Sequence, residues 1–205
     1  DKGKLIWFHG ASVGELLSIV PLIKHYEKNK TINQILITSS TLSSSKILNK
    51  YKFKKAIHQF YPIDHTILTS KFLNYWKPNI AIFVDSEIWP IMFRDLRNFK
   101  IPLILLNARL TKKTMDRWKK FQKFAKMVFK NISIAYPQNL ETNSFLKKLN
   151  LTKIKLIGNL KFSNIKKNKF DKIEKRLKLQ LKVKKIWVAS STHKNEEVFC
   201  AKTHI

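Results

Sequence analysis

Residues 5–17 read LIWFHGASVGELL, and the prediction of the fold starts from this stretch. The apolar run at residues 5–9 predicts a buried strand, and residues 15–28 have the apolar spacing of a helix. Between the two, Gly10 and Gly14 allow a tight turn and a close approach of the backbone, and the helix start offers free N–H groups to an anion. The glycine spacing matches neither the dinucleotide-binding fingerprint nor a Walker loop. A strand, a glycine-containing turn and a helix together predict the opening of an α/β domain.

The same alternation continues along the chain. Further strands are expected at residues 34–39, 56–61, 79–84, 102–106, 132–136 and 153–157, and helices at residues 43–51, 64–76, 90–99, 112–131 and 139–149. Asp64 and Thr111 stand where each could cap a helix. Because the strands are apolar almost throughout, both of their faces must be covered. The sequence therefore predicts a Rossmann-like open parallel sheet with helices on both faces.

Two changes of character divide the chain into predicted parts. Residues 1–162 form the Rossmann-like domain, and the lysine-rich residues 163–185 are a linker or a crossing helix. Residues 186–205 begin a second α/β domain, with a strand expected at residues 186–190. The chain starts with Asp1 rather than methionine and ends inside a predicted helix, so we expect a piece of a longer protein.

Composition narrows the function classes. With 205 residues and 44% hydrophobic residues, the chain can bury a core, which excludes a disordered basic tail despite a net charge of +28. A single cysteine excludes a disulfide framework, and no apolar run reaches the roughly 18 residues of a membrane-spanning helix. The charge has two interpretations: the lysine-rich composition of an AT-rich genome, or attraction to nucleic acid, phosphorylated small molecules or an anionic membrane.

Scarce acidic residues lie where such folds bind ligands, beyond the carboxyl ends of the strands. Glu15 opens the first helix, and Asp85 and Glu87 follow the buried strand at residues 79–84. A carboxylate in a first helical turn can simply complement the helix dipole, whereas in a cleft it can act as a general base. Spacing alone leaves both interpretations open, but two acidic loops at one edge favour a functional site.

Cationic and hydroxyl groups follow other predicted strands. Arg109 can bring a guanidinium to a phosphate or carboxylate, and Lys161 can meet developing negative charge. Ser191 and Thr192, beside a predicted helix start, can hold a phosphate. The histidines outside the first motif lack the spacing of metal ligands, and no metal site or cofactor is expected.

Five motifs in order carry a resemblance to a known family: WFHGASVGE at 7–15, DSEIWP at 85–90, LNARL at 106–110, GNLKF at 158–162 and ASSTHKNEE at 189–197. Over essentially the whole chain they resemble the 3-deoxy-D-manno-octulosonic acid (Kdo) transferases. The resemblance implies a two-domain glycosyltransferase fold called GT-B. It also implies inverting transfer of Kdo from CMP-Kdo to the lipid A precursor, without a metal, at the cytoplasmic face of the bacterial inner membrane. The implied partners are this donor, this acceptor and the anionic membrane surface; no nucleic acid is expected.

The resemblance also assigns roles to residues. It implies that Glu15 is the catalytic base and that Glu87 and Lys161 stabilise the transition state. From their places after predicted strands, we also expect Ser12, Gly14, Arg109, Ser191 and Thr192 to bind the substrates. Members of the family commonly have glutamate where this chain has Asp85, and often Ala-Val where it has Gly10-Ala11. The main CMP-binding motifs of the family lie further along than this chain extends, so we expect the 205-residue piece to be inactive alone.

Two alternatives stay open at this point. Another GT-B enzyme that uses a UDP-sugar would share the architecture, and only donor selectivity would separate it. A nucleic-acid-binding α/β module would explain the charge, although the base-stacking motifs of known RNA modules are absent from the sequence.

Overall fold

The computed structural model describes residues 3–160, 188–190, 192–193 and 195–204. The chain divides into two compact units, residues 1–165 and 166–205, and each is described here by itself. The predicted linker at residues 163–185 lies outside the described residues. The predicted domain boundaries therefore stay a prediction.

The first unit is built on a six-stranded sheet in which all neighbouring strands are parallel. Its strand order is β3-β2-β1-β4-β5-β6, the doubly wound order of a Rossmann fold. The strands are β1 (Lys4–His9), β2 (Ile32–Ser39), β3 (Ala56–Phe60), β4 (Ile80–Val84), β5 (Leu103–Ala108) and β6 (Ile134–Pro137). The predicted open parallel sheet is confirmed.

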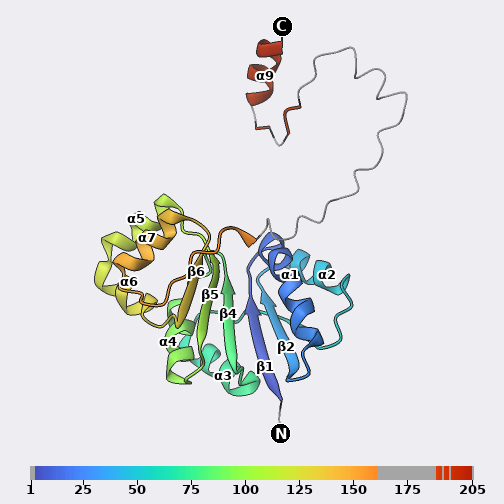
Figure 1. Ribbon diagram of the computed structural model, residues 1–205, viewed down its shortest axis with the longest axis vertical. Coiled ribbons are helices and arrows are strands. Elements are labelled where there is room, and N and C mark those ends of the chain that lie inside the picture. The colour runs from blue at the N-terminus through green and yellow to red at the C-terminus, as the bar shows by residue number, and fades with distance from the viewer. Residues whose placement is uncertain (1–2, 161–187, 191, 194, 205) are drawn as a thin grey trace. The chain divides into compact units, whose positions relative to one another are not determined.

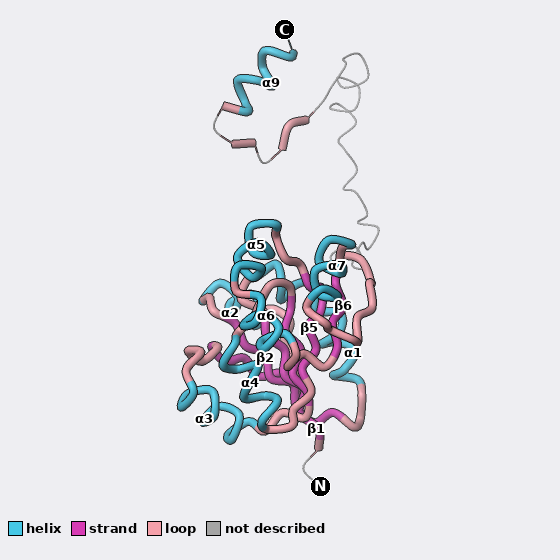
Figure 2. The backbone as a smooth tube through the Cα atoms, turned by 90° about the vertical axis from the view of Figure 1, so that its left-hand side faces the viewer, coloured by secondary structure: helices cyan, strands magenta, loops and turns pink. Residues whose placement is uncertain are grey.

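Helices cover both faces of this sheet (Figures 1 and 2). One face packs against α1 (Val13–Lys28) and α2 (Leu42–Asn49). The other packs against α3 (Thr66–Trp76), α4 (Pro90–Asn98), α5 (Lys112–Lys120), α6 (Gln122–Phe129) and α7 (Leu140–Lys148). In the described part of the second unit, α9 (Glu196–His204) is a helix.

Strand β1 shows why the strands are apolar on both faces. Leu5 and Trp7 belong to the core cluster on the α3–α7 side, and Ile6 and Phe8 to the cluster on the α1–α2 side. Because successive side chains of a strand point to opposite faces, both sets need apolar residues when helices cover both faces. Trp7 and Phe8 are completely buried.

The long helix expected at residues 112–131 is wrong, because the chain leaves helical geometry at Phe121, whose φ and ψ are −119° and 53°. The break brings the ring of Trp118 edge-on to the ring of Phe129, with centroids 5.3 Å apart. In one straight helix these residues would be separated by roughly 16 Å of axial rise. Aromatic packing thus outweighs helical continuity here.

Two predicted strands are also corrected. At residues 153–157 the chain runs beside β6 and makes backbone hydrogen bonds to Ala135 and Pro137, but its pairing amounts to one isolated bridge, between Ile154 and Ala135, and not to a strand. Residues 188–190, the described part of the strand expected at 186–190, are not a strand. A strand exists through its neighbour's hydrogen bonds, and a local sequence does not supply that neighbour.

Asp64 was expected to cap the helix that follows it, but it caps α4 instead. Helix α3 is capped by the ring of His65, whose Nδ1 accepts from the N–H of Ile67 at 3.4 Å. The two carboxylate oxygens of Asp64 accept from the N–H groups of Ile91 and Met92, at 3.1 and 2.8 Å. Helix α4 has no side-chain cap of its own, so Asp64 satisfies donors that would otherwise lack a partner.

We expect Asp64→Ala to lower the free energy of unfolding by about 1 to 2 kcal/mol, since it removes the acceptor for two N–H groups at a helix start. Asp64→Asn keeps one acceptor oxygen and should lose less. Urea unfolding of the three chains measures the difference, and an Asp64→Ala chain as stable as the original would contradict this capping role.

Candidate active site

The strand order places the loops that follow β1 and β4 beside each other. These two strands are neighbours in the sheet, and His9 at the end of β1 pairs with Phe83 near the end of β4. From β1 the chain continues outward to β2 and β3 on one side, and β4 begins the other side. Such a reversal of strand order opens a crevice at the carboxyl edge. The two predicted acidic motifs therefore meet there.

Glu15 is anchored at this edge by its own helix start. Ser12 is the N-cap residue of α1, and its hydroxyl donates to Oε1 of Glu15 at 2.9 Å. The N–H of Ala11 donates to Oε2 at 2.7 Å. A Cβ added to Gly10 would lie 3.2 Å from Cβ of Glu15, so glycine at this position leaves room for the glutamate. The carboxylate is thus fixed in place and half-buried.

Electrostatics show that the acidic residues share one environment. Burial raises the pKa of Glu15, and the negative charges of Glu87 and Asp85 raise it further, while hydrogen bonds from Ser12 and Ala11 oppose the shift. A charge acts in this way only at short range, because solvent screens distant charges. The charges of Asp85 and Glu87 therefore reach Glu15 at this edge of the sheet. A raised pKa suits a group that must accept a proton near neutral pH.

Glu87 is held by two nitrogen donors. Nε1 of Trp89 donates to its Oε2 at 2.9 Å, and Nε2 of His9 lies 3.3 Å from the same oxygen. The Glu87 side chain is 14% exposed, whereas that of His9 is completely buried. Burial lowers the pKa of His9, and its contact with Glu87 only partly offsets this. The His9 ring is therefore neutral at neutral pH.

Aromatic rings enclose His9 on the side of α3 and α4. The rings of Tyr61 and Phe83 lie 4.0 and 4.9 Å from the His9 ring, and Trp89 lies 6.2 Å away edge-on. Burial raises the pKa of Tyr61 well above its usual value, so its hydroxyl stays protonated. That hydroxyl is buried and has no hydrogen-bond partner within the described residues. Aromatic rings thus surround the buried His9 ring.

The ends of β4 and β5 adopt unusual backbone geometry. Asp85 and Asn107 have φ values of 63° and 54°, in the left-handed region, which Asp and Asn tolerate better than most residues. The register of β5 against β6 shifts between Leu106 and Ala108, at Asn107. Irregularities of this kind redirect side chains at functional edges.

Arg109 follows this irregularity, and its side chain is exposed. Its N–H donates to the backbone oxygen of Asp85 at 3.4 Å, which joins the loops after β4 and β5. Oδ1 of Asn107 accepts from the N–H of Leu160 at 3.0 Å, so the segment before Lys161 is tied to the same edge. Lys161 itself lies outside the described residues.

The remaining predicted site residues stand as follows. Gly14 and Ser12 are exposed in the first turn of α1 and at its cap. Ser191 lies outside the described residues. The hydroxyl of Thr192 donates to Oε1 of Glu197 in the first turn of α9, at 3.0 Å. Substrate contacts of these residues stay a prediction.

Sequence reasoning gave no role to His9 and did not single out Thr38. Thr38 lies on β2 directly opposite His9 and is completely buried. The available signal was the alternation of β1, which places His9 on the same face as Trp7, above an apolar core. A histidine and a threonine at that depth need polar partners.

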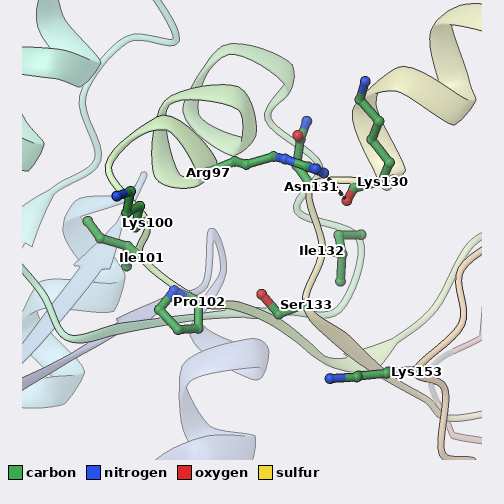
Figure 3. Close-up of a pocket in the computed structure, with 9 residues that line it drawn as sticks. All are labelled: Arg97, Lys100, Ile101, Pro102, Lys130, Asn131, Ile132, Ser133 and Lys153. Atoms are coloured by element: carbon green, nitrogen blue, oxygen red, sulfur yellow. Dashed lines mark hydrogen bonds between the residues drawn. The ribbon is translucent and has the colours of Figure 1, made fainter.

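A surface cavity of about 400 Å³ lies at the other end of the sheet (Figure 3). It is lined by residues just before β5 and β6, among them Pro102 and Ser133, and by Arg97, whose guanidinium points to the backbone oxygen of Lys130. It is remote from the carboxyl edge and does not belong to the candidate site. Within the described residues, no group of three His, Cys, Asp or Glu could hold a metal, and no helix is both long and apolar enough to cross a membrane.

The raised pKa of Glu15 predicts a pH-dependent stability difference from Glu15→Gln. A raised pKa means that folding disfavours the ionised form, so the original chain loses stability relative to the variant as pH rises from below 4.5 through the folded pKa. Glutamine can keep both hydrogen bonds without the charge. Urea unfolding of both chains between about pH 4 and pH 8 measures this; a difference that does not change with pH would contradict it.

The chain is similar in sequence to known proteins. Two relatives, both named 3-deoxy-D-manno-octulosonic acid transferase, come from Rickettsia bellii and Rickettsia felis. The first is 36% identical over 197 residues, covering 96% of this chain and 47% of the relative. The second is 37% identical over 194 residues, covering 94% of this chain and 41% of the relative. The chain thus spans less than half the length of these two relatives.

Solved structures support the fold. UDP-GlcNAc 2-epimerase from Neisseria meningitidis, bound to UDP-GlcNAc, superposes with a TM-score of 0.58 over 89% of this chain and 54% of the epimerase, at 14% identity. At that identity the likeness concerns the fold alone. The family model described as 3-deoxy-D-manno-octulosonic-acid transferase (kdotransferase) matches residues 1–164, and the chain belongs to this family.

Proposed function

We propose that this chain is the acceptor-side part of a glycosyltransferase that moves Kdo from CMP-Kdo to the lipid A precursor. Family membership supports the reaction class. The observation that carries the proposal for the site is that β1 and β4 are paired neighbours, so that Glu15 follows one strand and Glu87 the other, and burial together with the charge of Glu87 raises the pKa of Glu15. A base at a ligand-binding edge is what activation of a hydroxyl requires.

In the proposed mechanism, Glu15 removes the proton from a sugar hydroxyl of the acceptor. The hydroxyl oxygen forms a bond to the anomeric carbon of Kdo as the bond from that carbon to the phosphate oxygen of CMP breaks. The proton ends on Glu15 and the electron pair leaves with CMP, in a single inverting displacement. Glu87, which lies partly exposed beside Glu15, would stabilise positive charge that develops on the sugar.

Cationic groups would complete the site. We assign Arg109 and Lys161 to the phosphate and carboxylate groups of the substrates, with Lys161 also meeting charge in the transition state. The N–H of Arg109 donates to the backbone oxygen of Asp85. Oδ1 of Asn107 accepts from the N–H of Leu160, the residue before Lys161. Ser12 and Gly14 would contribute from the start of α1, and Ser191 and Thr192 from the donor side.

A second proposal concerns the membrane. The exposed apolar side chains of Phe121, Phe124 and Met127 lie on or beside α6, next to the many lysines of α5 and α6. Such a surface suits the cytoplasmic, anionic face of the bacterial inner membrane, where each well-placed lysine contributes about 1 kcal/mol.

We expect the chain to co-sediment with vesicles that contain phosphatidylglycerol and to be released by salt, because the attraction is electrostatic. Neutral phosphatidylcholine vesicles serve as the control. Equal binding to both vesicles would remove the electrostatic basis of this proposal.

The test of catalysis uses the full-length parent protein with CMP-Kdo and the lipid A precursor. Glu15→Gln should lower kcat by about 10²- to 10⁴-fold, the range for loss of a general base, while folding is retained. Glu141→Gln is the matched control, since Glu141 also stands in the first turn of a helix after a sheet strand, but its side chain is exposed. The control should keep full activity.

Three results would contradict the proposed function. Near-normal turnover by Glu15→Gln would contradict the role of Glu15 as the general base. Transfer from a UDP-sugar but not from CMP-Kdo would favour the other GT-B enzymes, and salt-dependent oligonucleotide binding with no response to the lipid acceptor would favour a nucleic-acid-binding module.

A further inference from the structure

We propose that His9 and Thr38 are positioning residues that orient the carboxylate of Glu87 for the transfer reaction. This inference rests on the proposed function and adds to it two residues that the motifs did not assign. Neither side chain is exposed, and neither has a place in the proposed proton transfer. Their role would be exerted only through Glu87.

A continuous chain of hydrogen bonds links the core to Glu87. Nε1 of Trp7 donates to Oγ1 of Thr38 at 2.9 Å, and Oγ1 of Thr38 lies 2.9 Å from Nδ1 of His9. Nε2 of His9 then lies 3.3 Å from Oε2 of Glu87, which Trp89 also contacts at 2.9 Å. Every polar side-chain atom of Trp7, Thr38 and His9 therefore has a partner.

The direction of each hydrogen bond follows from what each group can do. A carboxylate only accepts, so Nε2 of His9 must carry the hydrogen that points to Glu87. Because the buried ring is neutral, we assign Nδ1 as the acceptor and the hydroxyl of Thr38 as its donor at 2.9 Å, in preference to the backbone oxygen of Phe8, which lies 3.5 Å from the same hydroxyl. The indole of Trp7 only donates, and Thr38 accepts from it. One tautomer of His9 satisfies all four groups.

Packing prevents the His9 ring from rotating out of this arrangement. Tyr61 lies face to face with it at 4.0 Å, tilted by 31°, and Phe83 contacts it at 4.9 Å. The two donors on Oε2 hold Glu87 from the core side, and within the described residues no hydrogen bond involves its Oε1. The relay thus fixes one oxygen of Glu87 and does not use the other.

The first test measures steady-state kinetics of the full-length parent. His9→Phe keeps a buried ring but removes both hydrogen bonds, and we expect kcat to fall about 10- to 100-fold while KM for either substrate stays within about two-fold, because orientation rather than binding is lost. His9→Gln restores an N–H donor near the position of Nε2 and should recover most of kcat. A rise in KM with an unchanged kcat in His9→Phe, or a kcat that His9→Gln does not recover, would overturn the proposal.

His58 supplies the matched control. Its Nε2 lies 2.8 Å from the hydroxyl of Ser39, the residue after Thr38 on β2, so it is also a histidine joined to a hydroxyl. Among the residues that the structure describes, no carboxylate is hydrogen-bonded to its ring. His58→Phe should leave kcat unchanged. An equal loss in both phenylalanine variants would mean that removing any such histidine perturbs the sheet, and would overturn the specific role of His9.

Coupling to Glu87 tests the mode of action. If His9 acts only through Glu87, the double variant His9→Phe/Glu87→Gln should be no slower than Glu87→Gln. Multiplicative losses would overturn the proposal. The outcomes also separate the two proposals. If Glu15→Gln and Glu87→Gln both keep their activity, the proposed function is contradicted. If both lose activity while His9→Phe stays fully active, only the positioning role is contradicted.

A second measurement does not depend on activity or on a phenylalanine variant that folds. In the 205-residue chain, the ¹⁵N spectrum of the histidine rings should show His9 neutral with its hydrogen on Nε2. Thr38→Val should change the ring signals of His9, and Thr38→Ser, which keeps the hydroxyl, should not. A hydrogen on Nδ1, or ring signals that are the same in the valine variant, would overturn the relay.

Discussion

The parallel pairing of β1 with β4 is the contact on which the candidate site depends. It joins residues more than seventy positions apart, with Trp7 beside Ala81 and His9 beside Phe83. The chain reverses its winding direction at this pair, and folds of this kind bind their ligands beyond the carboxyl ends of the strands at such a reversal. Both carboxylates, and the relay beneath one of them, lie where they do because of this pairing.

Glu15 illustrates how a structural role and a chemical role coincide in one residue. Its contacts with Ser12 and Ala11 are those of a carboxylate that completes a helix start. Those same contacts fix its position, while burial and the neighbouring acids raise its pKa toward the range of a general base. The two interpretations that spacing left open are therefore not exclusive. A helix start supplies rigidity that a base on a mobile loop would lack.

The errors of the sequence predictions share a cause. Asp64 has the right residue type at the right place for a cap, but the N–H groups it satisfies belong to a helix 27 and 28 positions further along. The break at Phe121 follows from the contact of Trp118 with Phe129, and residues 153–157 lack the full pairing of a strand. In each case the deciding partner is distant in sequence or brought close by the fold, whereas local patterns report only nearest neighbours.

The sequence by itself determined the class of fold, the alternation of strands and helices along the chain, and the acidic residues that follow the strands. Apolar periodicity and turn residues are local properties, and these features depend on them. Its motifs also indicated the family. Only the tertiary structure decided which loops meet, that Glu15 lies within electrostatic range of Glu87, and that Thr38 and His9 stand behind Glu87. Those relations depend on strand order and register, since parallel neighbours are chosen by packing over the whole sheet and not by any single segment.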